Sequence, residues 1–87
     1  MFEKKHLFMP KIPRNITGQQ LCKMLKKYGY QKTRQTGSHI RLTKISDPVH
    51  NITVPDHRPI KIGTLNKILA DIASHLNISK DELIANL

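Results

Sequence analysis

Residues 35–44 read QTGSHIRLTK, and this stretch contains the signals that decide the fold. Gly37 and Ser38 are typical of a tight hairpin turn, because glycine tolerates the positive φ that such turns require. After the turn, Ile40 and Leu42 alternate with polar residues, which predicts a strand with one buried and one solvent-facing side. The solvent-facing side carries His39, Arg41 and Thr43. The stretch therefore predicts a hairpin that presents a histidine and an arginine to solvent.

The residues before this hairpin predict a helix and a first strand. Residues 17–20, TGQQ, have the form of a capping box, in which the threonine and glutamine side chains each satisfy a backbone N–H. Apolar residues then recur at helical spacing, and Gly29 is suited to end the helix in the left-handed conformation. Residues 30–36 suit a strand that leads into the turn.

The residues after the hairpin predict a third strand and two helices. Residues 51–55, NITVP, alternate polar and apolar side chains and end in a proline, which is typical of a strand that stops there. Leucine and isoleucine keep a helical period over residues 65–76, which predicts an amphipathic helix that starts between residues 61 and 64 and that Asn77 can end. Residues 79–82, SKDE, form a second capping box ahead of a short helix.

This order of elements predicts an α+β domain of two layers. Each long helix has one apolar stripe and the sheet has one apolar face, so both helices are expected on one face of a three-stranded antiparallel sheet. The expected topology is α-β-β-β-α with a short C-terminal helix, over residues 16–87. Residues 1–15 are expected to be a flexible basic extension, within which Met9 offers an alternative translation start.

The charge distribution favours a polyanionic partner. The 87 residues include 15 Lys and Arg against 6 Asp and Glu, which gives a net charge of +9. No acidic residue lies between residues 4 and 46, and a field of one sign over half a chain is typical of nucleic-acid binding. Binding to an acidic partner protein is the alternative that the charge leaves open.

Composition also disfavours several classes of protein. The chain has one cysteine, Cys22, and no Cys/His cluster with zinc-ligand spacing, so we expect no disulfide, no metal, no cofactor and a reducing cytoplasm. No apolar run approaches the ~20 residues that cross a bilayer, and the N-terminus lacks the apolar core of a secretion signal. Two-metal nuclease chemistry needs converging carboxylates, which the acid-free half does not supply.

RNA cleavage without metal is compatible with the sequence, because RNA supplies its own nucleophile, the 2′-hydroxyl. An imidazole has an unperturbed pKa of about 6.5 and can take or give the protons, which is worth about 10²–10⁴ in rate. Arginine can stabilise the charge that develops on phosphorus. His39 and Arg41, two residues apart on one strand, would project from the same face about 7 Å apart. The spacing alone equally allows His39 to be a polar surface residue or a phosphate contact.

The remaining basic residues are weaker candidates. His57, in the loop after the third strand, is the next candidate for proton transfer. The other histidines, His6, His50 and His75, are interpreted as solvated surface. The first helix carries lysines that either contact phosphate or form a solvated face: Lys23, Lys26 and Lys27. Few aromatic residues are present, so recognition of RNA backbone and shape is expected rather than base stacking.

From about Ile16 to Leu87 the sequence resembles the HicA, or YcfA-like, family of toxin mRNA interferases. The resemblance rests on GQQLCKMLKKYGY, RQTGSHIRLT, ITVPDHRPIKIGTLNKIL and LNISKDELIANL, in this order. It implies a fold like a double-stranded RNA-binding domain and cleavage of mRNA, with the histidine of GSH, here His39, as the catalytic residue. It also implies a HicB-type antitoxin that occludes this site. Ile40 stands where some members carry a second histidine, so a two-histidine arrangement is not available there.

We therefore predict the toxin of a type II toxin–antitoxin system, a metal-independent endoribonuclease. His39 is expected to act as general base or acid, and the turn at Gly37 and Ser38 to present it, while Arg34 and Arg41 hold phosphate. The predicted RNA contacts beyond these are Lys23, Lys26, Lys27, Lys32, Lys44 and His57. A non-catalytic double-stranded RNA-binding module shares the charge and fold, and a protein-interaction domain for an acidic partner is a third alternative.

Overall fold

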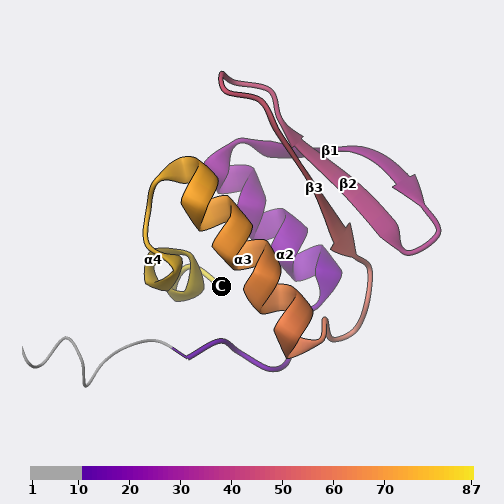
Figure 1. Cartoon of the computed structure of the whole chain (residues 1–87). Coiled ribbons are helices and arrows are strands. Elements are labelled where there is room, and N and C mark those ends of the chain that lie inside the picture. The colour runs from indigo at the N-terminus through magenta and orange to yellow at the C-terminus, as the bar shows by residue number, and fades with distance from the viewer. Residues whose placement is uncertain (1–10) are drawn as a thin grey trace, which may run out of the picture.

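The computed structural model describes residues 11–87, so the expectations for residues 1–10, including a start at Met9, lie outside the described residues. Along residues 11–87 the elements are, in order, α2 (Gly18–Leu25), η1 (Lys26–Tyr28), β1 (Tyr30–Thr36), β2 (His39–Lys44), β3 (His50–Pro55), α3 (Ile62–Leu76) and α4 (Lys80–Ala85). The strands form one antiparallel sheet in the order β1-β2-β3, and α2 and α3 lie on the same side of it (Figure 1). The predicted two-layer α-β-β-β-α fold with a short C-terminal helix is confirmed.

The helix ends follow from the capping residues that the sequence contains. The backbone N–H of Gln20 donates to Thr17 Oγ1 at 3.1 Å, and the N–H of Thr17 donates to Gln20 Oε1 at 2.9 Å. Gly29 adopts a φ of 92° after a short 3₁₀ turn, and Asn77 ends α3 with a φ of 58°. The first helix is therefore tighter over its last turn than a single regular helix would be, but it ends where predicted.

Gly18 allows the start of α2 to lie directly against the end of β3. A Cβ atom at this position would be 2.2 Å from the carbonyl oxygen of Pro55. The N–H of Gly18 instead donates to the carbonyl oxygen of His57 at 3.0 Å. Any larger residue would push α2 away from the loop after β3, so this glycine joins the two layers at one point.

The core lies between the helices and the sheet. Its fully buried residues come from α2, the sheet, the loop before α3, α3 and α4: Leu21, Leu25, Tyr30, Ile40, Leu42, Val54, Ile60, Leu65, Leu69, Ile72 and Leu83. Ile16, at the start of the predicted domain, packs against this core, and so does Ile12, which lies in the stretch predicted as an extension. Within residues 11–87, no helix combines the length and apolar character that a membrane crossing requires.

The strand register sets which side chains share the open face of the sheet. In β2, exposed and buried residues alternate as predicted, with Ile40 and Leu42 turned to the helices. His39 lies opposite Thr36 of β1 and Pro55 of β3. Arg41 lies opposite Arg34 and Thr53, and an irregularity between Lys32 and Arg34 shifts the register of β1. The open face therefore combines cationic and hydroxyl side chains from three strands.

Candidate active site

His39 is the first residue of β2 and follows directly on the turn between β1 and β2. Gly37 has a φ of 58°, which a residue with a side chain adopts only with strain. The turn is fixed from outside, because the N–H of Asp56 donates to Ser38 O at 2.7 Å. Gln35 Nε2 donates to Gly37 O at 3.1 Å and to Asp56 Oδ2 at 3.3 Å. The backbone that carries His39 is thus held by the loop after β3, while its side chain is exposed.

The side chain of His39 lines a hollow of about 310 Å³ on the open face. Its lining residues are Arg34, Thr36, His39, Arg41 and Thr53, and we call it the His39 hollow. None of them is acidic, and the two arginines face each other across β1 and β2. A guanidinium offers five N–H donors in a geometry that matches phosphate oxygens. The hollow therefore brings together two guanidinium groups, which can bind phosphate, and one imidazole, which can transfer a proton.

A second hollow of about 340 Å³ continues from the first along the same face. It shares Arg34 and Arg41 with the His39 hollow and adds Thr33, Thr43 and Asn51. These polar residues are linked, because Thr43 Oγ1 donates to Asn51 Oδ1 at 2.7 Å and lies 3.3 Å from Thr33 Oγ1. The face is therefore a continuous polar surface and not a single isolated pocket.

A comparison of the sequence with models of protein families identifies the family of this chain. The model of the family described as HicA toxin of bacterial toxin-antitoxin matches residues 18–73, a range that includes α2, the whole sheet and most of α3. The chain belongs to the HicA toxin family. It is thus the HicA toxin of a toxin–antitoxin system, and the resemblance seen in the sequence is confirmed. No curated protein and no solved structure matches the chain significantly.

One of the RNA contacts predicted for this HicA toxin is contradicted by the structure. Lys44 is buried, with 6% of its surface exposed. Its Nζ donates to Pro48 O at 2.9 Å, to Ser46 O at 3.1 Å and to Ser46 Oγ at 3.3 Å. The reason is strand alternation, since Lys44 has the same parity as Leu42 and therefore points to the helix side. Its ammonium stabilises the loop between β2 and β3 and is not available to phosphate.

The other predicted lysines are exposed but do not line the His39 hollow. Lys32 lies opposite Leu42, which places it on the helix side of β1. Burial raises the pKa of the Cys22 thiol and Asp56 raises it further, whereas Lys32 and Lys26 act in the opposite direction. Both lysines therefore lie near Cys22, and the thiol stays protonated, as expected for a packing residue. Lys23 and Lys27 line a separate hollow beside the C-terminal residues Asn86 and Leu87.

His57 is exposed and is connected to the site through its backbone. Its carbonyl oxygen accepts the N–H of Gly18, and the neighbouring Asp56 holds the turn before His39. The side chain lines neither the His39 hollow nor its continuation. The structure therefore brings Gly37, Ser38, Arg34 and Arg41 to His39 but does not place a second histidine there.

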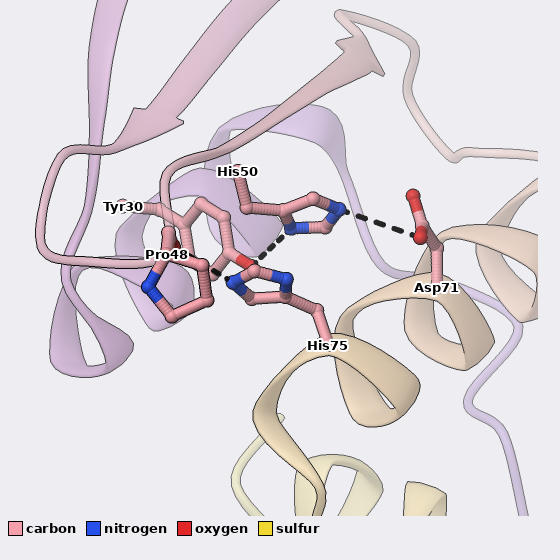
Figure 2. Close-up of polar contacts among 5 residues, drawn as sticks. All are labelled: Tyr30, Pro48, His50, Asp71 and His75. Atoms are coloured by element: carbon pink, nitrogen blue, oxygen red, sulfur yellow. Dashed lines mark hydrogen bonds and ion pairs between the residues drawn. The ribbon is translucent and has the colours of Figure 1, made fainter.

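The interpretation of His50 and His75 as solvated surface is wrong. Figure 2 shows them in a cluster with Tyr30 and Asp71, on the helix side of the sheet. Tyr30 Oη lies 2.6 Å from His50 Nδ1, and His50 Nε2 lies 3.4 Å from Asp71 Oδ1. The rings of His50 and His75 are stacked with centroids 4.1 Å apart, and His75 Nε2 lies 3.1 Å from Pro48 O.

The protonation of Tyr30 orders this cluster. Burial of the phenol, and to a lesser extent the charge of Asp71, raises the pKa of Tyr30 to about 12. The phenol is therefore protonated at neutral pH and donates to His50 Nδ1, which leaves the ring proton on Nε2, facing Asp71. Two signals in the sequence point to this cluster: His50 has the parity of buried Ile52, and Asp71 and His75 are four residues apart on one helix face.

No metal site accompanies either group of histidines in the described structure. Across residues 11–87, His, Cys, Asp and Glu nowhere gather in threes with a geometry that could hold an ion.

Three polar residues of the site were not assigned to it from the sequence. They are Thr36 and Thr53 in the His39 hollow and Asn51 beside it. Their outward parity in the strands is the signal that could have assigned them to the site.

Proposed function

We propose that this HicA toxin is an endoribonuclease that cleaves mRNA in the His39 hollow, without a metal ion. The observation that carries the proposal is an exposed imidazole that shares a hollow with two arginines, Arg34 and Arg41, whereas none of the five lining residues is acidic. Such a surface attracts a phosphate and places a proton-transfer group beside it. A purely structural histidine would be expected to have its ring nitrogens occupied by neighbours, as His50 has.

The reaction would use the 2′-hydroxyl of the RNA as nucleophile. Its oxygen forms a bond to the adjacent phosphorus while the bond from phosphorus to the 5′ oxygen breaks, which leaves a 2′,3′-cyclic phosphate and a 5′-hydroxyl. His39 takes the proton of the 2′-hydroxyl or, when protonated, gives a proton to the departing 5′ oxygen. Arg34 and Arg41 stabilise the extra negative charge on the phosphoryl oxygens. The other transfer needs a second group, and among residues 11–87 the hollow holds one imidazole, that of His39.

The RNA would continue from the hollow around the β1 edge of the sheet. Arg34 lies on the open face of β1, whereas Lys32 lies on the helix side of the same strand, near Lys26. A strand of RNA that crosses this edge meets cations on both sides of it, and then Lys23 and Lys27 on α2. Contacts of this kind are to phosphates and fix position without reading sequence. His57 is proposed as a further contact beside the turn.

A HicB-like antitoxin is proposed to neutralise the toxin by covering the His39 face. The face suits this role because it is open in the isolated chain, and one bound protein surface could exclude RNA from both connected hollows. The proposal predicts that the antitoxin protects residues of β1 and β2 from hydrogen exchange and that an excess of RNA competes with it.

The deciding experiment incubates wild-type and His39→Ala protein with single-stranded RNA in the presence of a chelator, followed by analysis of the RNA ends. We expect the wild type to produce 2′,3′-cyclic phosphate ends and His39→Ala to bind RNA without cleaving it. His75→Ala is the matched control, because it removes a histidine outside the hollow. Cleavage by His39→Ala at the wild-type rate would contradict the site. Wild-type protein that leaves single strands intact but shifts a duplex would identify the non-catalytic RNA-binding module instead.

A further inference from the structure

A third hollow extends the open face around the free edge of β3. It has a volume of about 310 Å³ and lies between β3 and α3, and we call it the β3–α3 groove. Arg41 lines this groove as well as the two hollows described above. A phosphate held by Arg41 would therefore have the His39 hollow on one side and the β3–α3 groove on the other.

The chemistry of the groove differs from that of the rest of the face. Ile52 and Ile68 give it apolar walls, and Lys67 and Asp71 project into it from α3. Among the described residues, those that line the His39 hollow and its continuation include no carboxylate, whereas the β3–α3 groove includes that of Asp71. A carboxylate repels phosphate, so backbone binding does not account for Asp71. It is instead an acceptor for the N–H groups on the edge of a nucleobase.

The carboxylate of Asp71 is held in place from the core. Its Oδ1 lies 3.4 Å from His50 Nε2, and His50 Nδ1 accepts from the hydroxyl of the fully buried Tyr30 (Figure 2). Oδ2 and the second lone pair of Oδ1 remain for a ligand, and the Asp71 side chain is 59% exposed. His50, itself hydrogen-bonded to the buried Tyr30, thus places a donor beside one oxygen of the Asp71 carboxylate before a ligand binds, as in sites whose groups are positioned in advance.

Asn51 and Lys67 supply the complementary donors. Asn51 Oδ1 already accepts from Thr43, so the free groups of this amide are its two N–H donors. Lys67 is an exposed cation on the same wall as Asp71. The groove thus presents one carboxylate acceptor next to His50, flanked by donors, with an apolar surface against which a flat ring can lie.

We propose that the β3–α3 groove is a base-binding subsite that takes a guanine next to the phosphate held at Arg41. Guanine offers two adjacent donors, N1–H and the 2-amino group, to one carboxylate, and its O6 and N7 accept from lysine or amide donors. Uracil offers one donor, N3–H, flanked by two carbonyl oxygens that the carboxylate of Asp71 would repel, and is disfavoured. The position of this base relative to a cleaved bond rests on the proposed ribonuclease function, whereas binding of the base does not.

The first test measures binding alone. Isotope-labelled His39→Ala protein is titrated with guanosine 5′-monophosphate and, separately, with uridine 5′-monophosphate, and the backbone amide shifts are followed by NMR. We expect shifts at Lys67 and Asp71 with guanosine monophosphate, and an affinity about tenfold or more above that for uridine monophosphate. Equal affinity for both nucleotides, or shifts confined to the His39 hollow, would overturn the proposal.

Two variants separate recognition from folding. Asp71→Asn is expected to remove the preference for guanosine monophosphate, because the amide presents donors to the donors of the base. Asp81→Asn, on α4 and outside the three hollows, is the matched control and should keep the preference. If Asp71→Asn weakens binding of the antitoxin but leaves the nucleotide preference intact, the groove is a protein contact and the proposal fails.

A cleavage assay distinguishes this proposal from the proposed function. Oligoribonucleotides that differ at one base are incubated with wild-type and Asp71→Asn toxin, and the cut sites are mapped. Cuts concentrated beside guanine in the wild type, and spread over the four bases in the variant, support both proposals. Cleavage without any preference beside guanine overturns the subsite and leaves the ribonuclease proposal standing. A guanine preference in binding without any cleavage overturns the ribonuclease proposal and leaves the subsite standing.

Discussion

Two histidines each begin a strand of the same sheet, and the structure places them in opposite environments. His39 begins β2 and His50 begins β3. The ring of His39 lines an open hollow with two arginines, whereas the ring of His50 is held by Tyr30, Asp71 and the stacked His75. Strand parity separates them, because His39 alternates with Ile40 and faces outward while His50 shares the inward parity of Ile52.

This difference teaches which histidine is free to act on a ligand. Both ring nitrogens of His50 face partners within the protein: Nδ1 accepts from Tyr30, and the ring proton on Nε2 faces Asp71. In the described structure the side chain of His39 is exposed, and the groups beside it are cations and hydroxyls. A histidine in the first environment contributes to stability, and a histidine in the second is available to a substrate.

The largest effect is expected from exchanging each histidine for alanine and comparing cleavage with stability. His39→Ala should lower the rate of RNA cleavage by about 10²–10⁴, because the proton transfer is lost, while the free energy of unfolding stays unchanged. His50→Ala should lower the free energy of unfolding by about 1–3 kcal/mol, because the buried Tyr30 hydroxyl loses its acceptor. Single-turnover cleavage of RNA by both variants checks the predicted change in rate. Urea unfolding of both variants checks the predicted change in the free energy of unfolding.

The contrast between His39 and His50 would be contradicted if either substitution lowered both the cleavage rate and the free energy of unfolding. A His39→Ala protein that unfolds as easily as His50→Ala would mean that His39 is part of the structure of the turn. A His50→Ala protein that keeps its fold but loses cleavage as completely as His39→Ala would move the chemistry to the cluster shown in Figure 2.

A smaller effect is expected where α2 meets the end of β3. Gly18→Ala places a methyl group 2.2 Å from Pro55 O, so the helix or the loop must shift, at a cost of about 1–3 kcal/mol in unfolding free energy. Since the loop also holds Ser38, cleavage should fall together with stability. Gly63→Ala in α3 is the matched control, because its Cβ meets no atom within 4 Å and alanine should stabilise the helix by about 0.5–1 kcal/mol. Equal stability of the two variants in urea unfolding would contradict this account of Gly18.

The fold was predictable because its signals are local. The capping box at Thr17, the glycine and asparagine that end the helices, and the alternation around Ile40 each specify one element, and together they leave few ways to pack. The same alternation would have placed Lys44 inward. The charge of Lys44 predicts an exposed side chain and its parity a buried one; parity prevails because carbonyl oxygens of the next loop accept from the ammonium.

The site was only partly predictable because its parts come from distant segments. Arg34 faces Arg41 only because the register of β1 shifts between Lys32 and Arg34, and no residue type in that stretch specifies such an irregularity. The cluster of Tyr30, His50 and Asp71 brings together residues from β1, β3 and α3. Contacts of this kind depend on how the layers pack, which a single sequence does not state.

The smallest effect is expected from removing the hydroxyl of Tyr30. The pH dependence of this effect tests whether the hydroxyl holds His50 within the protein, in contrast to the exposed His39. The folded-state pKa of about 12 lies above the ordinary value of 10.0, so the folded protein holds this proton more tightly than the unfolded chain does. Its contribution to stability is fully present below pH 10 and is lost as the pH rises towards 12. Tyr30→Phe should lower the unfolding free energy by about 1 kcal/mol at neutral pH, since His50 Nδ1 loses its donor. The variant should also lose less stability than the wild type between pH 10 and 12.

Tyr28→Phe is the matched control for this measurement. It removes the other tyrosine hydroxyl of the chain, which accepts from Asn86 Nδ2 at 2.9 Å at an exposed position. Urea unfolding at pH 8, 10 and 12 should show the wild-type pH dependence in Tyr28→Phe and a flatter one in Tyr30→Phe. If both variants follow the wild type, the phenol of Tyr30 does not hold the cluster, and the orientation of Asp71 must come from His50 and His75 alone.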